Sequence, residues 1–302
     1  MRIHHNPVEV IVQAPAKLNL FFEVIAKRSD GYHEIETLMY PVTMFDTLRF
    51  TPKSSGNIEF KCETSLGFSS INGPGAGDIP LDNSNLAVRA VELLREHAGI
   101  RTGAKLGLIK RIPSAAGLGG GSSDAAAALS AANLAWKLNW PLNKLASLGA
   151  KLGSDVPFFL ASGPAICRGR GEQVEPVDAP GMLNFVIVRP PEGLETEAVY
   201  KVCRPADYPL SVMPLIHALK QGNINEAGRM LFNRLLPSAL EMTPWIGRLK
   251  REFERLDCLG HGLSGSGSSY FGLCRHARHA RRIARRLQML NVGGVFAVHS
   301  CR

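Results

Sequence analysis

The 302-residue sequence predicts an α+β protein of two lobes. Three observations support this class: strand-like runs cluster in each half, amphipathic helical segments lie between them, and a glycine-rich loop joins a strand to a helix in the first half. The chain is long enough for two modest hydrophobic cores. We expect the border between the lobes near residue 163, which gives one lobe of residues 1–163 and another of residues 164–302.

The first lobe is expected to be built from four strands, three helices and a glycine loop. Apolar residues alternate along 8–25, and Asn83-Ser84 precedes a segment whose apolar positions fall on one helical face. Residues 67–80 are rich in glycine and proline, which predicts an exposed loop. Strands are predicted at residues 8–25, 43–51, 58–62 and 104–112, and helices at 86–97, 125–138 and 142–152.

The second lobe repeats the mixture of strands and helices. A second loop rich in glycine and serine, residues 262–269, precedes a short apolar strand. Strands are predicted at residues 165–168, 185–189, 270–274 and 294–299, and helices at 211–219, 244–256 and 277–290.

Composition places the chain among ordinary globular proteins. Hydrophobic residues make up 45% and charged residues 20%, and no apolar run reaches the length of about 18 residues that a membrane span requires. The N-terminus lacks the apolar core of a secretory signal, so we expect a cytoplasmic protein with no membrane partner. The six cysteines show no C-x-x-C pair and are expected to be reduced and structural.

The glycine loop at residues 112–124, IPSAAGLGGGSSD, has the properties of a phosphate cradle. Four glycines in five positions remove the Cβ atoms that would hold a ligand away from the backbone. The helix that follows offers free N–H groups and the positive end of its dipole, both of which favour an anion. The alternative is a flexible turn with a Ser/Asp cap, and the strand–loop–helix context argues against it.

Two other nucleotide loops are excluded by the same residues. No Gly-Lys-Ser/Thr ends the loop, as a Walker loop requires, and the G-x-G-x-x-G spacing of a dinucleotide fingerprint is absent. The net charge of +9 suits anionic ligands in general without choosing among nucleotides, phosphorylated metabolites and nucleic acid.

Three stretches together resemble the GHMP kinases (galacto-, homoserine, mevalonate and phosphomevalonate kinases). They are APAKLNL at 14–20, PSAAGLGGGSS at 113–123 and GLSGSGSSYF at 262–271, and they occur in the expected order across almost the whole chain. The resemblance implies ATP with Mg²⁺ as the phosphoryl donor. It also implies an N-terminal lobe like the second domain of ribosomal protein S5 and a ferredoxin-like C-terminal lobe.

Two further stretches, DGYHE at 30–34 and LGSDVPFF at 152–159, resemble one branch of that family. The resemblance implies transfer of the ATP γ-phosphoryl group to the 2-hydroxyl of a CDP-linked methylerythritol. Homoserine or mevalonate is the alternative acceptor, and the Asp-Gly-Tyr-His segment argues against both. The sequence departs from the pattern at Ser114-Ala115-Ala116, where more glycine is expected, and in the length of the 67–80 loop.

The resemblance assigns chemistry to a small set of residues. Asp155 is the expected general base and Lys17 its electrostatic partner, although each alone resembles a helix cap or a solvated strand residue. Asn19, two residues after Lys17 on the same strand face, is expected to bind the acceptor. The expected nucleotide-binding residues are Pro113, Ala115, Gly117, Leu118, Gly119, Gly120, Gly121, Ser122, Ser123, Asn85 and Lys110.

The cytidine of the acceptor is expected to meet aromatic side chains. Tyr32 and His33 suit stacking on the base and contact with its polar edge, and Tyr200 matches an aromatic on its other face. The alternative interpretation of Tyr200 is an ordinary packed aromatic. The alternative for Asn85 and Lys110 is that each is a helix cap or a surface charge. The remaining expected substrate contacts are Thr196, Gly265 and Ser266. No side chain is assigned to a metal.

A nucleic-acid-binding protein is the rival class. Its support is the arginine-rich run at 275–286 and the basic isoelectric point. The arginines are interpreted as the solvated face of a docked helix, because an apolar stripe runs beside them. The stripe consists of Ala277, Ala280, Ile283/Ala284, Leu287 and Leu290. No aromatic platform accompanies the charge. We therefore expect small-molecule substrates, no nucleic-acid partner, and a monomer or weak homodimer.

Overall fold

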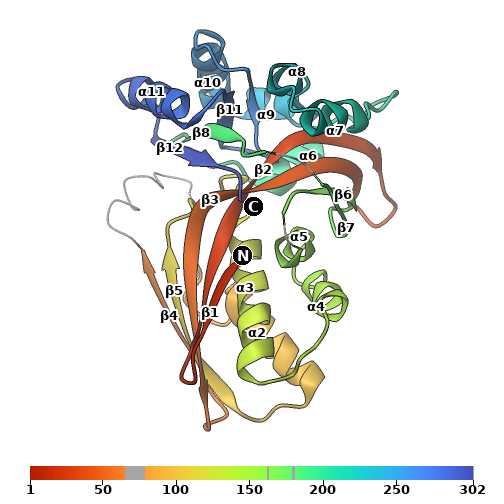
Figure 1. Cartoon of the computed structure of the whole chain (residues 1–302). Helices are drawn as coiled ribbons and strands as arrows, with labels where there is room; N and C mark the ends of the chain where they lie inside the picture. Colours follow the sequence, from red (N-terminus) through yellow and green to blue (C-terminus); the bar gives the residue numbers. More distant parts are fainter. Residues whose placement is uncertain (65–78, 162, 179–180, 302) are drawn as a thin grey trace.

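The computed structural model describes residues 1–64, 79–161, 163–178 and 181–301. These residues form an α+β fold with two sheets, which confirms the predicted class (Figure 1). The larger sheet comprises β1 (Arg2–His5), β2 (Val10–Lys27), β3 (His33–Lys53), β4 (Ile58–Thr64), β5 (Gly103–Lys110), β6 (Ala165–Gly169), β7 (Gln173–Pro176) and β9 (Phe232–Asn233). The smaller sheet comprises β8 (Asn184–Arg189), β10 (Gly260–Leu263), β11 (Tyr270–Cys274) and β12 (Gly294–His299).

Strands β2 and β3 form the frame of the molecule and run from one lobe into the other (Figure 1). They pair antiparallel along their length, with shifts of register at Pro15/Ala16, Asn19/Phe21 and Val24/Ala26. Irregularities of this kind change the direction of side chains and are frequent beside active sites. Two of the three flank Lys17 and Asn19, the polar pair predicted from the sequence.

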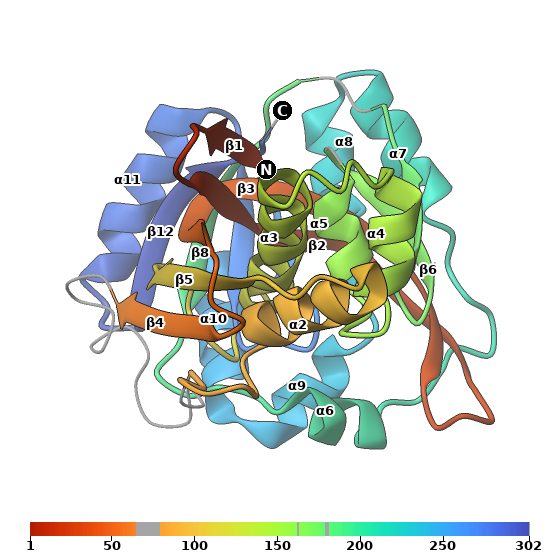
Figure 2. The same ribbon diagram turned by 90° about the horizontal axis from the view of Figure 1, so that it is seen from below.

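Three helices, α2 (Leu86–Ala98), α3 (Gly120–Ala135) and α4 (Leu142–Gly149), gather on one side of the first lobe's strands (Figure 2). Helix α3 is buried from Ser123 to Asn133 because its alanines let neighbouring elements approach closely. The short helix α5 (Val156–Leu160) follows and packs against α3. Rigid packing around α3 fixes the loop at its N-terminus.

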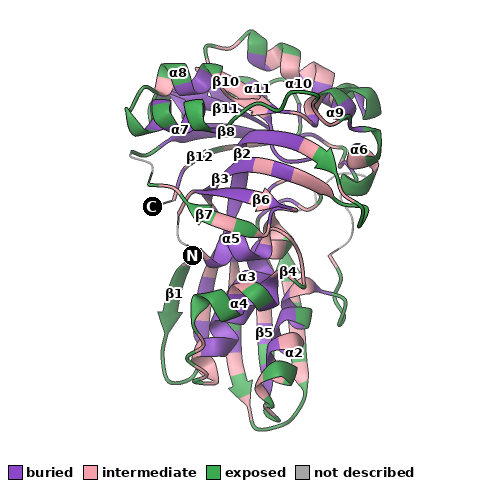
Figure 3. Cartoon of the chain, turned by 90° about the vertical axis from the view of Figure 1, so that its right-hand side faces the viewer, coloured by how far each residue is buried: buried purple, intermediate pink, exposed green. Residues whose placement is uncertain are grey.

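The second lobe has the order of a ferredoxin-like fold. Its antiparallel sheet runs β10-β11-β8-β12, with helices connecting β8 to β10 and β11 to β12. The helices of this lobe are α6 (Thr196–Val202), α7 (Met213–Lys220), α8 (Ile224–Arg229), α9 (Leu236–Met242), α10 (Pro244–Glu254) and α11 (Ala277–Gln288). Helices α10 and α11 cover the outer face of the sheet, with their exposed residues turned away from it (Figure 3).

Helix α11 confirms the interpretation of the arginine-rich run as a docked helix. Ala280, Ile283, Ala284 and Leu287 are buried against the core, while the arginines lie on the outer face. Asp257 compensates part of the positive charge of the run, since its carboxylate pairs with Arg275 at 3.3 Å and with Arg282 at 2.5 Å.

Most predicted elements are present, and the differences have local causes. Strand β3 begins at His33, ten residues before the predicted start, because it continues through the polar positions 33–37 to pair with β2 and β6. Helix α3 starts at Gly120, inside the glycine loop. The border at residue 163 stays a prediction; β6 and β7, which follow it, join the larger sheet. Most of the 67–80 loop lies outside the described residues.

Two other expectations concern the whole chain. All six cysteines are free thiols, as predicted. Among the described residues, none of the helices combines the length and apolarity needed to cross a bilayer.

Candidate active site

A cavity of about 1150 Å³ lies where the two lobes meet. Its walls come from the glycine loop, the β2–β3 hairpin, the segment around Asp155, helix α6 and the loop between β10 and β11. All of the predicted site residues line it except Asn19 and Ser123. Residues up to 250 positions apart in sequence are therefore brought to one place, although their roles remain predictions.

The glycine loop is packed too tightly for side chains at two positions. Gly117 has φ +69°, and a Cβ there would lie 2.1 Å from the carbonyl oxygen of Ser264. Gly119 has φ +70° and caps α3, and a Cβ there would lie 2.8 Å from the Phe159 ring. The first helical bond of α3 runs from the Ser123 N–H to the Gly119 oxygen at 2.9 Å. The amides before Ser123 thus stay available to an anion, as the cradle hypothesis requires.

Ala115 in this loop has φ +47°, a left-handed conformation that costs a residue with a Cβ roughly 1–2 kcal/mol. Ala115→Gly is therefore expected to raise the free energy of unfolding by up to about 1 kcal/mol, after the larger chain entropy of glycine is deducted. Urea titration measures this. Ala116, buried and outside the left-handed region, is the matched control: Ala116→Gly should lose about 1–2 kcal/mol. A destabilised Ala115→Gly variant would contradict the strain argument.

Lys17 and Asp155 face each other in the cavity. The Lys17 ammonium lies 3.6 Å from Asp155 Oδ2, and its side chain is only 5% exposed. Asp155 occupies the cap position of α5, but its side chain makes no cap hydrogen bond. The simple helix-cap reading of Asp155 is therefore wrong, and the carboxylate is free to serve the cavity. The Lys17 backbone N–H donates to the Leu118 oxygen at 3.0 Å, which ties β2 to the glycine loop.

Asn19 holds Lys17 and does not face the cavity. Its Oδ1 accepts from the Lys17 ammonium at 2.6 Å, and its amide donates to Thr37 Oγ1 at 2.8 Å. Thr37 Oγ1 in turn donates to the Phe21 carbonyl oxygen at 2.7 Å, and this bond fixes the orientation of the hydrogen-bonded side chains Thr37, Asn19 and Lys17. The expectation that Asn19 contacts the acceptor is therefore wrong. The oxygen and the amide nitrogen of its side chain both bond to neighbouring residues, and Asn19 is 1% exposed.

The serine-rich loop after β10 supports the glycine loop from the second lobe. Ser264 Oγ donates to the Gly117 oxygen at 2.9 Å, and the Ser269 N–H donates to the Ala116 oxygen at 3.1 Å. Thr196 and Ser266, both predicted to touch substrate, share a hydrogen bond of 2.9 Å at the cavity wall. The two lobes are therefore joined directly beneath the predicted phosphate site.

Aromatic rings line another part of the cavity, here called its aromatic end. The rings of His33 and Tyr200 are 5.1 Å apart, and Phe22 meets Tyr200 edge-on at 6.5 Å. Tyr32 is 53% exposed, so its ring is open to a partner. Burial, together with the nearby Lys27 charge, lowers the pKa of His33 below its ordinary value. The imidazole is therefore neutral at pH 7 and can both donate and accept a hydrogen bond.

Sequence reasoning missed the positive charge at this end. Arg170 lies over the Tyr32 ring at 4.7 Å, and Lys27 and Lys201 also line the cavity. Arg170 stands in the turn between β6 and β7, next to Gly171, whose Cβ position is 3.7 Å from Asp155 Oδ1. The available signal was an arginine between two glycines directly after a predicted strand.

Beneath the glycine loop lies a buried ion cluster. The Lys110 ammonium pairs with Asp46 and with Asp124, the latter at 2.7 Å, and all three side chains are at most 5% exposed. The surface-charge alternative for Lys110 is therefore wrong. Burial opposes a charged lysine, but the two carboxylates outweigh it and raise the pKa of Lys110. Burial also raises the pKa of Asp124, to about 8, with Lys110 opposing and Asp46 adding to the shift.

Two further predictions are refined by position. Asn85 caps α2, with Oδ1 accepting from the Ala87 N–H at 3.0 Å, and it also lines the cavity. The cap alternative is thus confirmed without removing Asn85 from the nucleotide side. Ser123 is fully buried and does not line the cavity, because its side chain leaves α3 on the core side. The expectation that the Ser123 hydroxyl contacts a nucleotide is therefore wrong.

Two family models match the chain: GHMP kinases N terminal domain at residues 85–163 and GHMP kinases C terminal at residues 215–290. A Pelotomaculum thermopropionicum protein named 4-diphosphocytidyl-2-C-methyl-D-erythritol kinase is 39% identical over 90% of this chain and 92% of its own length. A Shouchella clausii protein of the same name is 36% identical over 90% of this chain and 88% of its own length.

Solved structures agree with these similarities. A crystal structure of 4-(cytidine 5'-diphospho)-2C-methyl-D-erythritol kinase superposes with a TM-score of 0.80 at 35% identity, covering 97% of this chain and 99% of the other. Homoserine kinase from Cytophaga hutchinsonii has a TM-score of 0.74 at 19% identity, covering 100% and 97%, and shows the shared fold alone.

Proposed function

This chain belongs to the GHMP kinase family, and we propose that it phosphorylates the 2-hydroxyl of 4-diphosphocytidyl-2-C-methyl-D-erythritol, a step in the non-mevalonate route to isoprenoid precursors. The observation that carries the proposal is the single cavity that joins a phosphate cradle, the Lys17–Asp155 pair and an aromatic, basic end. The chain is a kinase of the kind that transfers a phosphoryl group to an alcohol, as its named relatives are. The finer assignment of acceptor rests on the aromatic end and on the named relatives.

Asp155 acts as the general base in this proposal. Its carboxylate takes the proton of the acceptor hydroxyl as that oxygen attacks the γ-phosphorus, and the bond from the γ-phosphorus to the bridging oxygen of ADP breaks. Lys17, held by Asn19, pairs with Asp155 and stabilises negative charge on the transferring phosphoryl group. The amides at the start of α3 hold the ATP phosphates in line with the acceptor.

Mg²⁺ would neutralise part of the phosphate charge when bound. The start of α3 offers such an ion the Ser122 hydroxyl, an oxygen ligand on a residue that lines the cavity. Phosphate and water oxygens would supply the other ligands that Mg²⁺ prefers.

The aromatic end suits a cytidine diphosphate. Tyr32 and Tyr200 offer faces for stacking, and the neutral His33 can bond to the polar edge of a cytosine. Arg170, Lys27 and Lys201 supply positive charge for a diphosphate. Homoserine and mevalonate contain neither a base nor a diphosphate, and they would leave these groups unused.

A coupled assay of ADP release tests the acceptor. The purified chain is offered the cytidine-linked methylerythritol, homoserine and mevalonate in parallel, with ATP and Mg²⁺. Turnover is expected on the cytidine substrate and at background level on the other two. Turnover on homoserine or mevalonate, with none on the cytidine substrate, would show that the acceptor assignment is wrong while leaving the family intact.

Tyr200→Ala is expected to raise KM for the cytidine substrate by about 5- to 100-fold, because one base–aromatic stack is worth about 1–3 kcal/mol. The KM for ATP should stay within about twofold, since the ring neighbours of Tyr200 are Phe22 and His33, which are not part of the glycine loop. Steady-state kinetics with each substrate varied separates the two constants. Tyr208→Ala, a tyrosine that is 90% exposed, is the control and should change neither. If Tyr200→Ala leaves the KM for the cytidine substrate unchanged, Tyr200 is an ordinary packed aromatic and does not stack on the base.

A further inference from the structure

The hydroxyl group of Thr37, on β3, is buried and has a fixed direction. It donates its proton to the Phe21 carbonyl oxygen at 2.7 Å, and a hydroxyl group has only one proton to donate. Toward the Asn19 side chain, 2.8 Å away, the Thr37 oxygen can therefore only accept. Thr37 is 0% exposed, so bulk water does not compete for either bond.

The direction of the Thr37 hydroxyl determines which way the Asn19 amide points. An amide has an oxygen that accepts and an NH2 group that donates, and rotation of the side chain exchanges their places. Because Thr37 Oγ1 can only accept, it bonds the NH2 group and leaves the amide oxygen facing Lys17. The Lys17 ammonium donates to that oxygen at 2.6 Å. In the opposite orientation the NH2 group would meet the ammonium, and two donors would face each other.

The second lobe closes over the contact between Asn19 and Lys17. A Cβ built on Gly265 would lie 3.2 Å from the Lys17 ammonium nitrogen and 3.3 Å from Asn19 Oδ1. The Ser264 hydroxyl oxygen also accepts from the Asn19 backbone N–H, at 3.4 Å. The Asn19 side chain therefore has little room to shift as a whole. Rotation of its amide is the freedom that remains, and the Thr37 hydroxyl removes it.

We propose that Thr37 is a positioning residue for phosphoryl transfer. By fixing the Asn19 amide, it holds the Lys17 ammonium at its place in the cavity wall, although Thr37 itself is not among the lining residues. One ammonium proton goes to Asn19, which leaves two for Asp155 and for an oxygen of the transferring phosphoryl group. The inference rests on the role of Lys17 in the proposed function, but not on the identity of the acceptor.

Thr37→Val tests the proposal, because valine keeps the branched shape of threonine and removes the hydroxyl. The Asn19 NH2 group then loses its acceptor, the amide is free to turn, and kcat is expected to fall by about 10- to 100-fold. The KM values for ATP and for the acceptor should stay within about twofold, because the glycine loop and the aromatic end are unchanged. Thr37→Ser, which restores a hydroxyl, should return kcat to within about threefold of the wild type. Steady-state kinetics measures these constants.

A double-mutant cycle with Lys17→Met separates positioning from a structural effect. If Thr37 acts through Lys17, adding Thr37→Val to Lys17→Met should not lower kcat further, since the positioned group is gone. A structural defect would lower kcat by the same factor in both backgrounds, and that result would overturn the proposal. Thr43→Val is the matched control on β3: its hydroxyl accepts from the His299 backbone N–H at 3.0 Å, away from the cavity, so kcat should not change.

Asn19→Leu tests the same contact without any change at Thr37. It breaks the hydrogen-bonded series at the next residue and should lower kcat at least as much as Thr37→Val. A kcat within about twofold of the wild type in either variant would overturn the proposal, as would a loss confined to KM. If only Lys17→Met loses activity, the role of Thr37 fails and the proposed function stands. If Lys17→Met keeps the wild-type kcat, the proposed role of Lys17 fails, and that of Thr37 with it.

Discussion

Asp155→Asn is expected to lower kcat by about 10²- to 10⁴-fold, the usual contribution of a positioned general base. The amide has the shape of the carboxylate but cannot accept the proton of the acceptor hydroxyl. The affinities for ATP and for the cytidine substrate should stay within about twofold, because Asp155 carries no hydrogen bond of the loop or cap. Single-turnover kinetics and equilibrium titration measure the two quantities separately.

The Lys17–Asp155 distance of 3.6 Å gives this prediction a second part. Residues that act together in one step show strongly non-additive effects. Lys17→Met should also lower kcat, and the double variant should be little slower than Asp155→Asn alone. Additive losses would mean that the two side chains act independently. A general base contributes at least about 10²-fold to kcat. If Asp155→Asn keeps more than about a tenth of the wild-type kcat, the loss is too small for a general base, and Asp155 does not have that role.

The parts of the site that the sequence predicted are those carried by local motifs. The glycine loop combines its conformation, its helix dipole and its close packing within thirteen consecutive residues, 112–124, so its chemistry can be read in one stretch. Lys17 and Asp155 are far apart in sequence, and they were assigned through resemblance to a family. The sequence does not show that these two side chains face each other; the structure does, because they pair at 3.6 Å in the cavity.

The parts that were missed depend on pairs of residues distant in sequence. Asn19 was expected to point at the acceptor because it shares a strand face with Lys17, but Thr37 and the Lys17 ammonium take up its side chain. Lys110 looked like either a nucleotide contact or a surface charge, because Asp46 stands 64 residues away. Periodicity assigns a side chain to a face, whereas hydrogen-bond partners across the sheet depend on register.

Strand β3 illustrates the same limit for the fold. The sequence pattern indicated a strand only at residues 43–51, since 33–37 contains charged and polar side chains. In the structure Glu36 pairs with Arg168 at 3.0 Å, and Thr37 belongs to the chain that orients Lys17. Polar residues of this strand are buried with partners from other elements, so the expected alternation of apolar and polar positions is lost.

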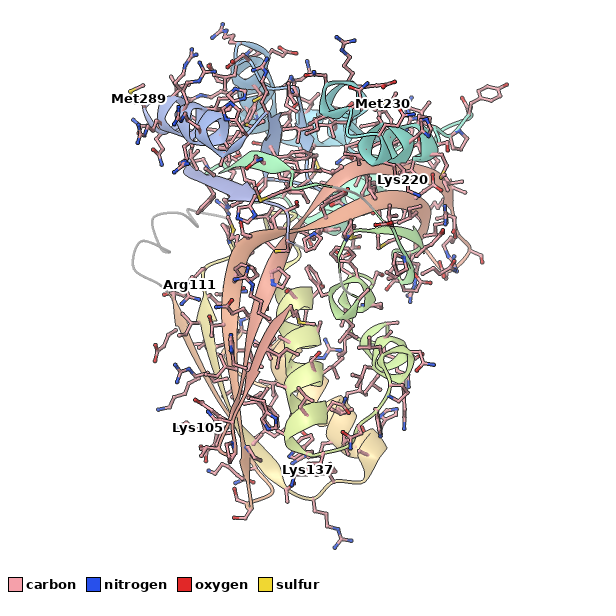
Figure 4. The ribbon with its side chains drawn as sticks, in the orientation of Figure 1. Lys105, Arg111, Lys137, Lys220, Met230 and Met289 are labelled. Carbon is pink, nitrogen blue, oxygen red and sulfur yellow. The ribbon has the colours of Figure 1, made fainter. Side chains whose placement is uncertain are left out.

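Lys110→Met should give the largest loss of stability among the changes considered. Methionine fills a similar volume but leaves two carboxylates buried without their cation, and removal of one partner from a buried ion pair costs about 3–5 kcal/mol. Urea denaturation without nucleotide measures the free energy of unfolding. Lys105→Met is the matched control on the same strand, because Lys105 lies on the exposed outer face of β5, and it should change stability by less than about 0.5 kcal/mol (Figure 4).

A double variant identifies the cause of the Lys110→Met loss. Adding Asp124→Asn removes the carboxylate that no backbone group stabilises, whereas Asp46 keeps its two backbone donors. The double variant should therefore recover part of the lost stability, by about 1–2 kcal/mol, since the penalty for an unpaired buried group falls when its charge is removed. Equal losses in the single and double variants would place the cost in the packing of the Lys110 stem. Recovery would mean that Lys110 is retained at this buried position to compensate the two buried carboxyl groups beside it.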